Sequence, residues 1–595
     1  MPDRPMHADR PPIRIANCSG FYGDRVAAAR EMVEGGPIDV LTGDYLAELT
    51  MLILWKARRK DPDAGYATTF LTQMEQVLGT CLDREIKIVA NAGGLNPSGL
   101  ANRLRELADR LGLSPKIAYI TGDDLTDRLD DLLRSGHLLA HLDTGKPLAQ
   151  AGVEPVTANA YLGGWGIAEA LGAGADIVIC PRVTDASLVV GPAAWWHGWS
   201  RTDYHSLAGA VAAGHLIECG PQATGGNYSW LHEITDRRRP GFPIAEVAAD
   251  GSSVITKHPG TGGLVSVGTV TAQLLYEIAE PAYRNPDVVA RFDTLRLSAD
   301  GPDRVRVLGT QGSPPPAEAK VAINYRGGYR NTMTLVLTGL DIAEKATWAE
   351  RELFEILGGR ATFAEVDTRL IRYDRPDAPS NEQATAHLRI TVKDPDPRKV
   401  GRRFSNATME LALGGYAGFH TTTPPSPESA YGVYWPALIP ATEVEHTVVL
   451  PDGTRRLIPP TDANSTYVGF GPTYVEYVVP EGPTVHAPLG RIAAARSGDK
   501  GGNANVGVWT RDPAAFGWLR EYLTTERVRE LIPEAAALPV HRYELPNLSA
   551  LNFVLVGLLG DGVAASARPD PQAKGLGEYL RSRLAGIPAS LLDES

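Results

Sequence analysis

The fold of this chain is decided by the stretch Arg14-Ile-Ala-Asn-Cys-Ser-Gly-Phe-Tyr-Gly-Asp-Arg25. An apolar run breaks there into polar and glycine residues, and Val26-Ala-Ala-Ala-Arg-Glu-Met-Val33 then resumes with helical spacing. This order predicts a strand, a glycine turn and a helix. Loops at the carboxyl ends of parallel strands expose backbone N–H groups, and the dipole of the following helix favours an anion. We therefore expect a ligand beside this turn.

The turn does not have the form of a nucleotide-binding loop. Ser19-Gly-Phe-Tyr-Gly23 lacks the G-x-G-x-x-G spacing of dinucleotide sites and the Gly-Lys-Ser/Thr ending of phosphate-binding loops. No nucleotide cofactor is expected.

Composition places the chain among multidomain globular proteins. Its 595 residues are too many for one ordinary core, and 43% hydrophobic with 22% charged residues is typical globular composition. A net charge of −12 leaves no general basic field, which argues against a nucleic-acid partner. The apolar runs are far shorter than a membrane span, and the first ten residues are polar. We expect a soluble, cytoplasmic protein that does not bind membranes.

Four cysteines, at 18, 81, 180 and 219, are far apart and form no Cys-x-x-Cys pair. This spacing argues against a disulfide scaffold and against a zinc ribbon. Cys18 and Cys219 lie in glycine turns, where a nucleophile is conceivable. Since no histidine partner is identifiable from the sequence, small buried residues are the favoured interpretation.

Residues 11 to about 195 alternate short apolar runs with helical patterns. The strand candidates are 13–16, 38–41, 86–90, 117–120, 156–160 and 177–180. Such alternation predicts a parallel sheet, and we prefer an open doubly wound sheet to a closed eight-stranded barrel. Polar or glycine-bearing loops follow several of these strands at 42–48, 91–97, 121–124 and 181–187. These loops should converge on the carboxyl edge, the usual place of an active site in both architectures.

Two further glycine-rich stretches follow at 214–227 and 257–263. Each combines glycine with side chains that form hydrogen bonds, which a loop needs if its backbone must approach a ligand closely. Turn geometry alone also explains glycine. Together with the earlier loops, ligand contact is favoured.

We divide the chain into three regions. Residues 12–264 form the α/β parallel-sheet domain with its glycine-rich ligand loops. Residues 265–481 form an α+β region packed on the first domain, with strand patterns at 269–274 and 335–337. Residues 482–595 form a small ferredoxin-like α+β domain. It opens with two apolar runs that flank a polar loop, Arg496-Ser-Gly-Asp-Lys-Gly-Gly-Asn-Ala-Asn505.

Five motifs together resemble the acyclic terpene utilisation family, AtuA. They are Asn17-Cys-Ser-Gly-Phe-Tyr-Gly-Asp-Arg25, Asn91-Ala-Gly-Gly-Leu-Asn-Pro97, Arg182-Val-Thr-Asp185, Glu218-Cys-Gly-Pro-Gln-Ala-Thr-Gly-Gly-Asn227 and Arg496-Ser-Gly-Asp-Lys-Gly501. The resemblance covers about residues 12 to 590, the C-terminal ferredoxin-like domain included. It implies a place in the catabolism of branched acyclic terpenoids through acyl-CoA intermediates.

The loops supply the candidate site residues. The catalytic candidates are Asp24, Asp44, Asp185, Asp499 and Lys500, because carboxylates and a lysine can act as general acid or base. The substrate-binding candidates are Asn17, Ser19, Tyr22, Arg25, Asn91, Gly93, Gly94, Asn96, Arg182, Glu218, Gln222, Thr224, Asn227, Ser497, Asn503 and Asn505. Arginines can clamp an anionic group, and amides can donate to a developing oxyanion or enolate.

The same carboxylates, with Asp123 and Asp124, would also suit a divalent metal, but the sequence has no compact metal-ligand motif. His137 and His141 stand four apart with Asp143 close by, which fits one helical face. The apolar residues around them favour a core edge instead. The identity of any metal stays open.

Two classes of function follow. The preferred one is a cytosolic enzyme of lyase, hydratase or hydrolase type that acts on a branched acyl or acyl-CoA compound. The alternative is a noncatalytic subunit that binds an acyl-CoA or stabilises a partner carboxylase or dehydrogenase. In either case we expect a small-molecule partner and a homo-oligomer, with the C-terminal domain closing over the sheet edge of its own or a neighbouring subunit.

Overall fold

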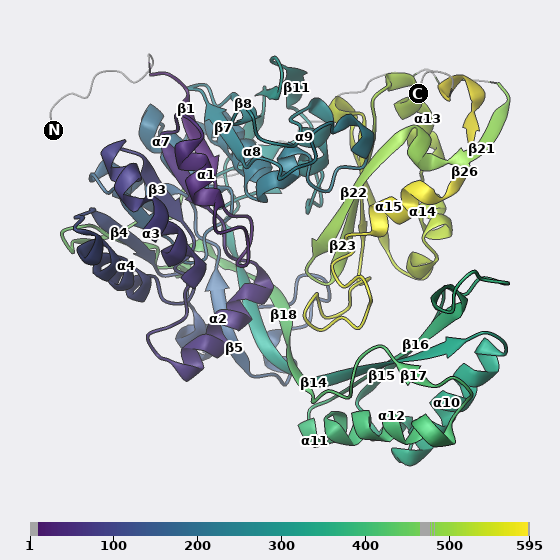
Figure 1. Ribbon diagram of the computed structural model, residues 1–595. Helices are drawn as coiled ribbons and strands as arrows, with labels where there is room; N and C mark the ends of the chain where they lie inside the picture. The colour runs from purple at the N-terminus through teal and green to yellow at the C-terminus, as the bar shows by residue number, and fades with distance from the viewer. Residues whose placement is uncertain (1–9, 464–476, 478, 481, 593–595) are drawn as a thin grey trace. The chain divides into compact units, whose positions relative to one another are not determined.

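The computed structural model describes residues 10–463, 477, 479–480 and 482–592 (Figure 1). Two compact units divide the chain. Unit 1 holds residues up to Asn324, Tyr434–Val563 and the residues from Asp570 on, and unit 2 holds Tyr325–Val433 and Ala564–Pro569. The chain enters unit 2 along β14 (Glu318–Thr338) and leaves it along β18 (Ser429–Pro440). Each unit is described by itself below.

The main sheet of unit 1 is an open mixed sheet with a parallel centre. The centre consists of β1 (Ile13–Asn17), β2 (Val40–Gly43), β3 (Lys87–Ala90), β6 (Ile177–Ile179) and β4 (Ile117–Thr121), in that spatial order. Antiparallel strands extend it beyond β1 by β7 (Pro243–Val247), β8 (Ser253–Lys257), β12 (Arg304–Leu308) and β11 (Arg296–Ala299), and beyond β4 by β19 (Thr447–Val449) and β20 (Arg455–Leu457). The predicted α/β class with a parallel sheet is confirmed.

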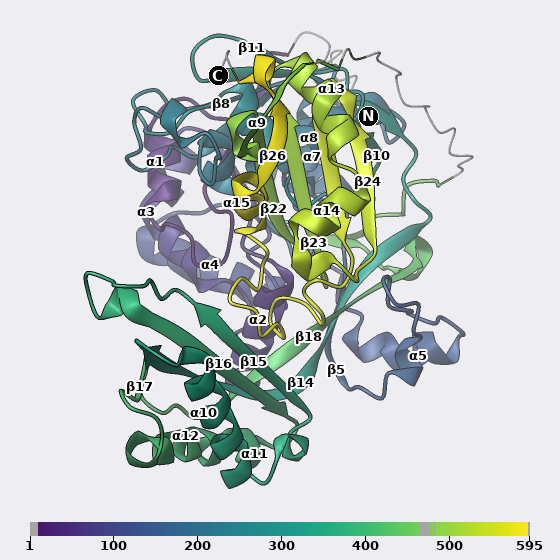
Figure 2. The ribbon, with the colours of Figure 1, turned by 90° about the vertical axis from the view of Figure 1, so that its right-hand side faces the viewer.

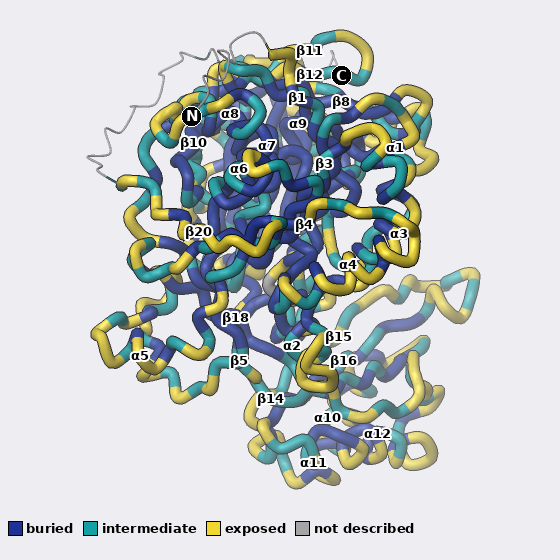
Figure 3. Tube along the Cα trace, turned by 90° about the vertical axis from the view of Figure 1, so that its left-hand side faces the viewer, coloured by how far each residue is buried: buried dark blue, intermediate teal, exposed yellow. Residues whose placement is uncertain are grey.

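Helices cover both faces of this sheet because its central strands are apolar on both sides. Successive residues alternate between two cores: Ile15 and Val40 pack on one face, while Ala16 and Leu41 pack on the other. One face carries α1 (Ala28–Glu34), α3 (Thr68–Asp83) and α4 (Pro97–Leu111), and the other carries α6 (Trp165–Gly172), α7 (Ser187–His197) and α8 (Tyr204–Ile217). In Figure 3 the tube is dark blue at central strands such as β3, and parts of α1 and α3 are yellow.

The strand order reverses next to β4. The chain steps outward from β1 to β4 with helices on one face, and then returns to place β6 between β3 and β4 with α6 on the other face. In open α/β sheets such a reversal leaves a crevice at the carboxyl ends of the strands. The loops after β2, β3, β4 and β6 all lie at that end of the sheet.

The predicted strand at 156–160 exists, but it does not belong to this sheet. As β5 (Pro155–Ala160) it pairs with β14 instead. Thr157 and Asn159 are polar and buried, and Thr157 Oγ1 accepts a 3.0 Å hydrogen bond from Asn324 Nδ2. The centre of a parallel sheet has no place for such side chains, because it is apolar on both faces.

Further elements of unit 1 surround the sheet. They are α2 (Glu48–Lys60), α5 (Leu129–Arg134), α9 (Val267–Leu274), β9 (Ala282–Arg284), β10 (Val289–Arg291) and β13 (Gln311–Ser313). Within the described residues, no helix is long and apolar enough to cross a membrane.

The C-terminal part of unit 1 is a ferredoxin-like α+β domain, as predicted. Its antiparallel sheet runs β22 (Ala493–Lys500), β23 (Asn503–Thr510), β25 (Ala550–Leu555) and β24 (Val540–Leu545) in spatial order. One face packs on α13 (Pro513–Tyr522) and α14 (Thr525–Leu531), and α15 (Leu576–Ser582), β21 (Thr484–Pro488) and β26 (Leu584–Pro588) complete the domain (Figure 2). Trp509 and Ala550 of the other face belong to the core that the main sheet and α8 also share.

The polar loop expected at 496–505 is a tight hairpin instead. Lys500 pairs with Asn503, so that only Gly501 and Gly502 form the turn, and the polar residues lie on β22 and β23. Glycine in these strands allows a close approach of another segment. A Cβ atom on Gly498 would lie 2.3 Å from the ring of Tyr276.

Unit 2 is an antiparallel sheet with helices on one face. Its strands run β15 (Glu365–Arg372), β16 (Thr385–Asp394), β14 and β17 (His420–Thr421). Apolar residues such as Leu335 and Leu388 pack against α10 (Ile342–Ile356), α11 (Pro397–Val400) and α12 (Arg402–Gly414).

Candidate functional site

A cavity of about 760 Å³ opens at the carboxyl end of the main sheet of unit 1. This volume lies within the usual range for small-molecule sites. The loops after β1, β2 and β6, the segment after α8, the segment 276–283, β14, β18 and the C-terminal domain all line it. Its charged lining residues are Asp24, Asp44, Asp143, Arg182, Asp185, Glu218, Glu277, Lys320, Asp499, Lys500 and Lys574.

Arg182 is the buried cation around which the acids of the cavity gather. Its guanidinium donates to the Leu46 carbonyl oxygen at 2.8 Å and to Asp185 Oδ1 at 3.1 Å from one nitrogen, and to the Tyr161 hydroxyl at 3.1 Å from another. These bonds fix Arg182 between the loop after β2 and the turn after β6. Asp185 completes the ion pair and keeps 28% of its side chain exposed, so that water and a ligand can reach it.

Two further carboxyl groups lie beside this ion pair. Burial raises the pKa of Asp44 and of Glu218 well above the ordinary range, and the charge of Asp185 adds to both shifts. The Arg182 cation opposes these shifts without overcoming them. Asp44 and Glu218 therefore hold a proton more tightly than an ordinary carboxyl group does, which suits a proton donor. We call Asp44, Asp185 and Glu218 the acid cluster.

A neutral histidine supports one member of the acid cluster. Glu218 Oε1 lies 3.0 Å from Nδ1 of His215, which packs against the rings of Tyr283 and Phe292. Burial lowers the pKa of His215 to about 4. The hydrogen bond between His215 Nδ1 and Glu218 Oε1 holds the Glu218 carboxyl group in a defined direction.

Asparagines place the loops that carry the acids. Asn91 Nδ2 donates to Asp44 Oδ1 at 2.5 Å, and Asn91 Oδ1 accepts from the Tyr45 N–H at 2.7 Å. Asn17 Nδ2 donates to the Ile217 carbonyl oxygen at 2.7 Å, which ties the first loop to the end of α8. Gly20 lies so close to Cys219 that a Cβ atom would meet its carbonyl carbon at 2.8 Å. The first loop and the 218–227 segment thus form one wall.

Asp24 lines the cavity, and its carboxylate accepts hydrogen bonds from the backbone of its own loop. It accepts from the Gly20 N–H at 2.8 Å and from the Arg25 N–H at 2.7 Å. Arg25 points elsewhere, donating to Glu31 at 2.7 Å and to the Pro240 carbonyl oxygen at 3.2 Å.

The C-terminal domain brings two lysines to the cavity, and the segment 276–283 supplies their partners. Lys500 Nζ donates to the Glu277 carbonyl oxygen at 2.9 Å. Lys574 Nζ contacts the Tyr276 hydroxyl and lies 4.0 Å from Glu277 Oε1, and burial lowers its pKa. Lys320, from β14, lies over the rings of Tyr161 and Tyr434 at 5.0 and 5.7 Å from their centroids.

The sequence-derived candidates therefore fall into two groups. Ten of them line the cavity: Asp24, Asp44, Arg182, Asp185, Glu218, Gln222, Asn227, Asp499, Lys500 and Asn503. The others are absent from the lining, and most of them make structural contacts: Asn17, Ser19, Tyr22, Arg25, Asn91, Gly93, Gly94, Asn96, Thr224, Ser497 and Asn505. Asn96, for example, caps α4 by accepting from the Gly99 N–H at 2.9 Å.

Sequence reasoning missed several residues that line the cavity, namely Tyr161, Tyr276, Glu277, Tyr283, Lys320, Tyr434 and Lys574. Tyr161 carried a signal, since it follows a predicted strand directly. The others come from the middle region and from a C-terminal turn, and only the pairing of β14 with β5 and β18 brings Lys320 and the two tyrosines together.

The thiols fit the interpretation as buried small residues. All four cysteines are free, and burial raises the pKa of Cys18 and of Cys81 to about 12 and that of Cys180 further. Burial and the neighbouring Glu218 raise the pKa of Cys219, the one that lines the cavity, well above its usual value. Within the described residues no three His, Cys, Asp or Glu side chains gather in a metal-binding group.

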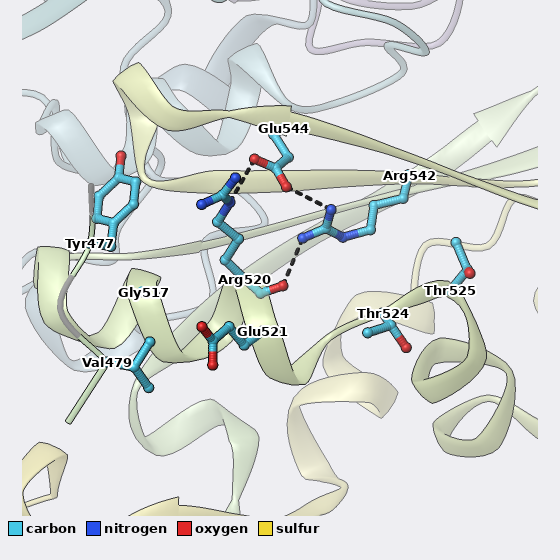
Figure 4. A pocket seen from close by; sticks show the side chains of 9 residues that line it. All are labelled: Tyr477, Val479, Gly517, Arg520, Glu521, Thr524, Thr525, Arg542 and Glu544. Carbon is cyan, nitrogen blue, oxygen red and sulfur yellow. Dashed lines mark hydrogen bonds and ion pairs between the residues drawn. The ribbon is translucent and has the colours of Figure 1, made fainter. Parts of the chain in front are cut away.

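A second cavity, of about 480 Å³, lies on the helical side of the C-terminal domain (Figure 4). Its charges neutralise one another: Glu544 accepts from Arg520 at 2.8 Å and from Arg542 at 2.7 Å, and Arg542 also donates to the Arg520 carbonyl oxygen. Glu544 and the two arginines thus form a surface network of ion pairs.

Comparison with protein families decides the membership of the chain. The family described as acyclic terpene utilisation family protein AtuA matches this chain over residues 13–450, which is most of its length. The chain belongs to the AtuA family. The AtuA ferredoxin-like domain matches residues 487–584, which contain the whole β22-β23-β25-β24 sheet. Family membership implies a role in acyclic terpene utilisation. Comparison with curated proteins and with solved structures gives no match.

Proposed function

We propose that this AtuA protein is an acid–base enzyme that adds water to, or eliminates it from, a branched acyl or acyl-CoA compound. The observation that carries the proposal is the acid cluster around Arg182, in which two buried carboxyl groups of raised pKa stand beside one ion-paired carboxylate. Groups whose environments push their pKa values apart mark a division between acid and base.

In the direction of hydration, the Asp185 carboxylate takes a proton from water, and the water oxygen forms a bond to the β-carbon of the unsaturated acyl group. The π electrons move to the carbonyl oxygen as an enolate, which the neighbouring cation Arg182 stabilises. The α-carbon then takes the proton of Glu218 or Asp44. Proton transfer within the cluster, from Asp185 to the acid that was spent, restores the starting state.

The environment of the Cys219 thiol favours hydration or dehydration by the acid cluster over hydrolysis by a cysteine nucleophile. A nucleophilic cysteine needs a lowered pKa, and the pKa of Cys219 is raised. A carboxylic acid and a carboxylate close to each other suit proton transfer to and from carbon.

The test is turnover of a branched 2-enoyl-CoA by the purified full-length protein, followed by loss of the ultraviolet absorption of the conjugated thioester. Asp185→Asn and Glu218→Gln should each lower kcat by a factor of about 100 or more, the usual contribution of a general acid or base. Two acids of exposed i,i+3 ion pairs provide matched controls: Asp131→Asn and Glu106→Gln should leave kcat unchanged.

Absence of turnover in the wild-type protein, together with tight binding of the same thioester, would contradict the proposal. That result would favour a noncatalytic acyl-CoA-binding subunit. Turnover that survives both cluster variants would remove the acid cluster from the mechanism.

A further inference from the structure

Lys320 has a cationic group that lines the cavity and lacks a polar partner. Within the described residues, no hydrogen bond or ion pair involves its ammonium group, although an ammonium carries three donors. The other two lysines of the cavity differ. Lys500 donates to the Glu277 carbonyl oxygen, and Lys574 contacts the Tyr276 hydroxyl.

Three adjacent strands fix this position. Lys320 lies on β14, which pairs with β5 on one side and with β18 on another. Tyr161 directly follows β5, and Tyr434 lies on β18. Lys320 and Ala322 share a side of β14 because strand side chains alternate, and Ala322 packs with both tyrosines in one small core. Tyr161 and Tyr434 are each 8% exposed, so their positions are set by packing.

The Tyr161 ring shows how far Lys320 is from Arg182, the ion-pair partner of Asp185 in the acid cluster. Cζ of Arg182 lies 4.4 Å from the centroid of Tyr161, and Nζ of Lys320 lies 5.0 Å from it. The two cationic groups therefore cannot be further apart than about twice the larger distance. Cation–π contact holds Lys320 in place but leaves its donors available to an anion.

We propose that Lys320 is the subsite for a carboxylate carried by the acyl chain itself, so that the substrate is a branched dicarboxylic acid or its monothioester. This proposal rests on the proposed function in one respect, namely that the thioester end of the substrate is the end that reacts at the acid cluster. An anion at Lys320 lies within that distance of Arg182, which is paired with Asp185 of the acid cluster, and the second carboxylate of a compact acyl chain suits such a spacing. The phosphates of coenzyme A are separated from its thioester by the long pantetheine arm, and they do not fit this spacing.

The experiment measures binding by calorimetry to the full-length protein, with three probes: 3-methylglutarate, the matched monocarboxylate 3-methylbutyrate, and coenzyme A. The wild-type protein should bind the dicarboxylate at least about tenfold more tightly than the monocarboxylate, the difference that one charge-assisted contact supplies. Lys320→Met should remove this preference and leave the monocarboxylate affinity unchanged. Lys320→Arg should retain it, and the exposed control Lys116→Met should behave as wild type.

Three results would overturn the proposal. They are a wild-type protein without preference for the dicarboxylate, an equal loss for both acids in Lys320→Met, and a loss confined to coenzyme A. The last would assign Lys320 to a phosphate. Because binding requires no turnover, a protein that prefers the dicarboxylate but never converts a thioester would refute the enzyme and leave this subsite standing.

Discussion

Single side chains of the cavity divide into those that face a ligand and those whose polar atoms serve the fold. Asp24 belongs to the second kind, since both of its oxygens accept backbone N–H groups of its own loop. Asp24→Asn should therefore lower the free energy of unfolding by about 1 kcal/mol and keep most of the activity. Thermal melts and turnover on the same sample check this. Lost activity at unchanged stability would instead return Asp24 to the chemistry.

Buried acids should make stability fall as pH rises. The folded-state pKa of Asp123 is raised by burial to about 7, so the folded protein holds a proton that the unfolded chain has released. Below pH 6.5 this loss is opposed by His215 and His446, whose folded-state pKa values are lowered to about 4 and about 3. Above pH 6.5 the unfolded-state histidines lose their remaining protons within about one pH unit, so their contribution fades and opposes that of the buried acids less and less.

Asp123 should therefore make the melting temperature of the wild type fall, relative to that of Asp123→Asn, as pH rises toward and through its folded-state pKa of about 7. One group contributes at most about 1.4 kcal/mol per pH unit to this slope. Asp123→Asn should flatten the decline, although it also weakens bonds from Asn159 and Arg182. Melting curves of both proteins across this pH window measure the effect. If the melting temperature has the same dependence on pH in the two proteins, Asp123 is ionised throughout the window.

The sequence is most informative where a residue's place follows from its own strand. Asp44, Arg182 and Asp185 follow β2 and β6, and the parallel order alone brings them to one edge. Asn91 and Ser497 belong to similar motifs, yet their side chains bond to neighbouring loops. Periodicity gives the position of a loop residue, but the direction of its side chain depends on partners far away in sequence. Lys320 could not be predicted for that reason.

At the level of turns and strands, close backbone approach forms the wall between the first loop and the 218–227 segment. Gly20→Ala should place a methyl group against the backbone of Cys219, at a cost of about 1–3 kcal/mol. The matched control is Gly79→Ala in the interior of α3, where only an ordinary contact at 3.9 Å awaits and the helix should gain about 0.5–1 kcal/mol. Chemical denaturation measures both. A neutral Gly20→Ala would mean that the two segments are not held together tightly.

Strand partners are the least predictable feature among the elements. Residues 156–160 form a strand, as expected, but this strand pairs with β14 outside the main sheet, and its polar residues Thr157 and Asn159 are buried there. The 496–505 segment has the polar composition of a loop, and it forms a hairpin whose polar side chains face the cavity or neighbouring backbone. Strands that line a site do not show the pattern of strands that line a core.

The molecule as a whole has two compact units with separate cores. Leu388 lies in the core of unit 2, and Val178 lies in the main sheet of unit 1. Calorimetry should therefore resolve two transitions. Leu388→Ala should lower the temperature of one transition only, with a loss of unfolding free energy of roughly 2–5 kcal/mol, as is typical of a buried leucine. Val178→Ala should lower the temperature of the other transition only. A single transition that moves with both variants would show that the units unfold together.

Proton transfer at the acid cluster is the central step of the proposed function. The most direct measurement is exchange of the α-proton of a saturated branched acyl-CoA with solvent deuterium, followed by NMR in the absence of net turnover. The wild-type protein should catalyse this exchange, Asp185→Asn and Glu218→Gln should lose it, and Asp131→Asn should keep it. Exchange at equal rates in the wild type and in both cluster variants, or no exchange by the wild type with bound acyl-CoA, would contradict the assignment of this cluster as an acid–base site.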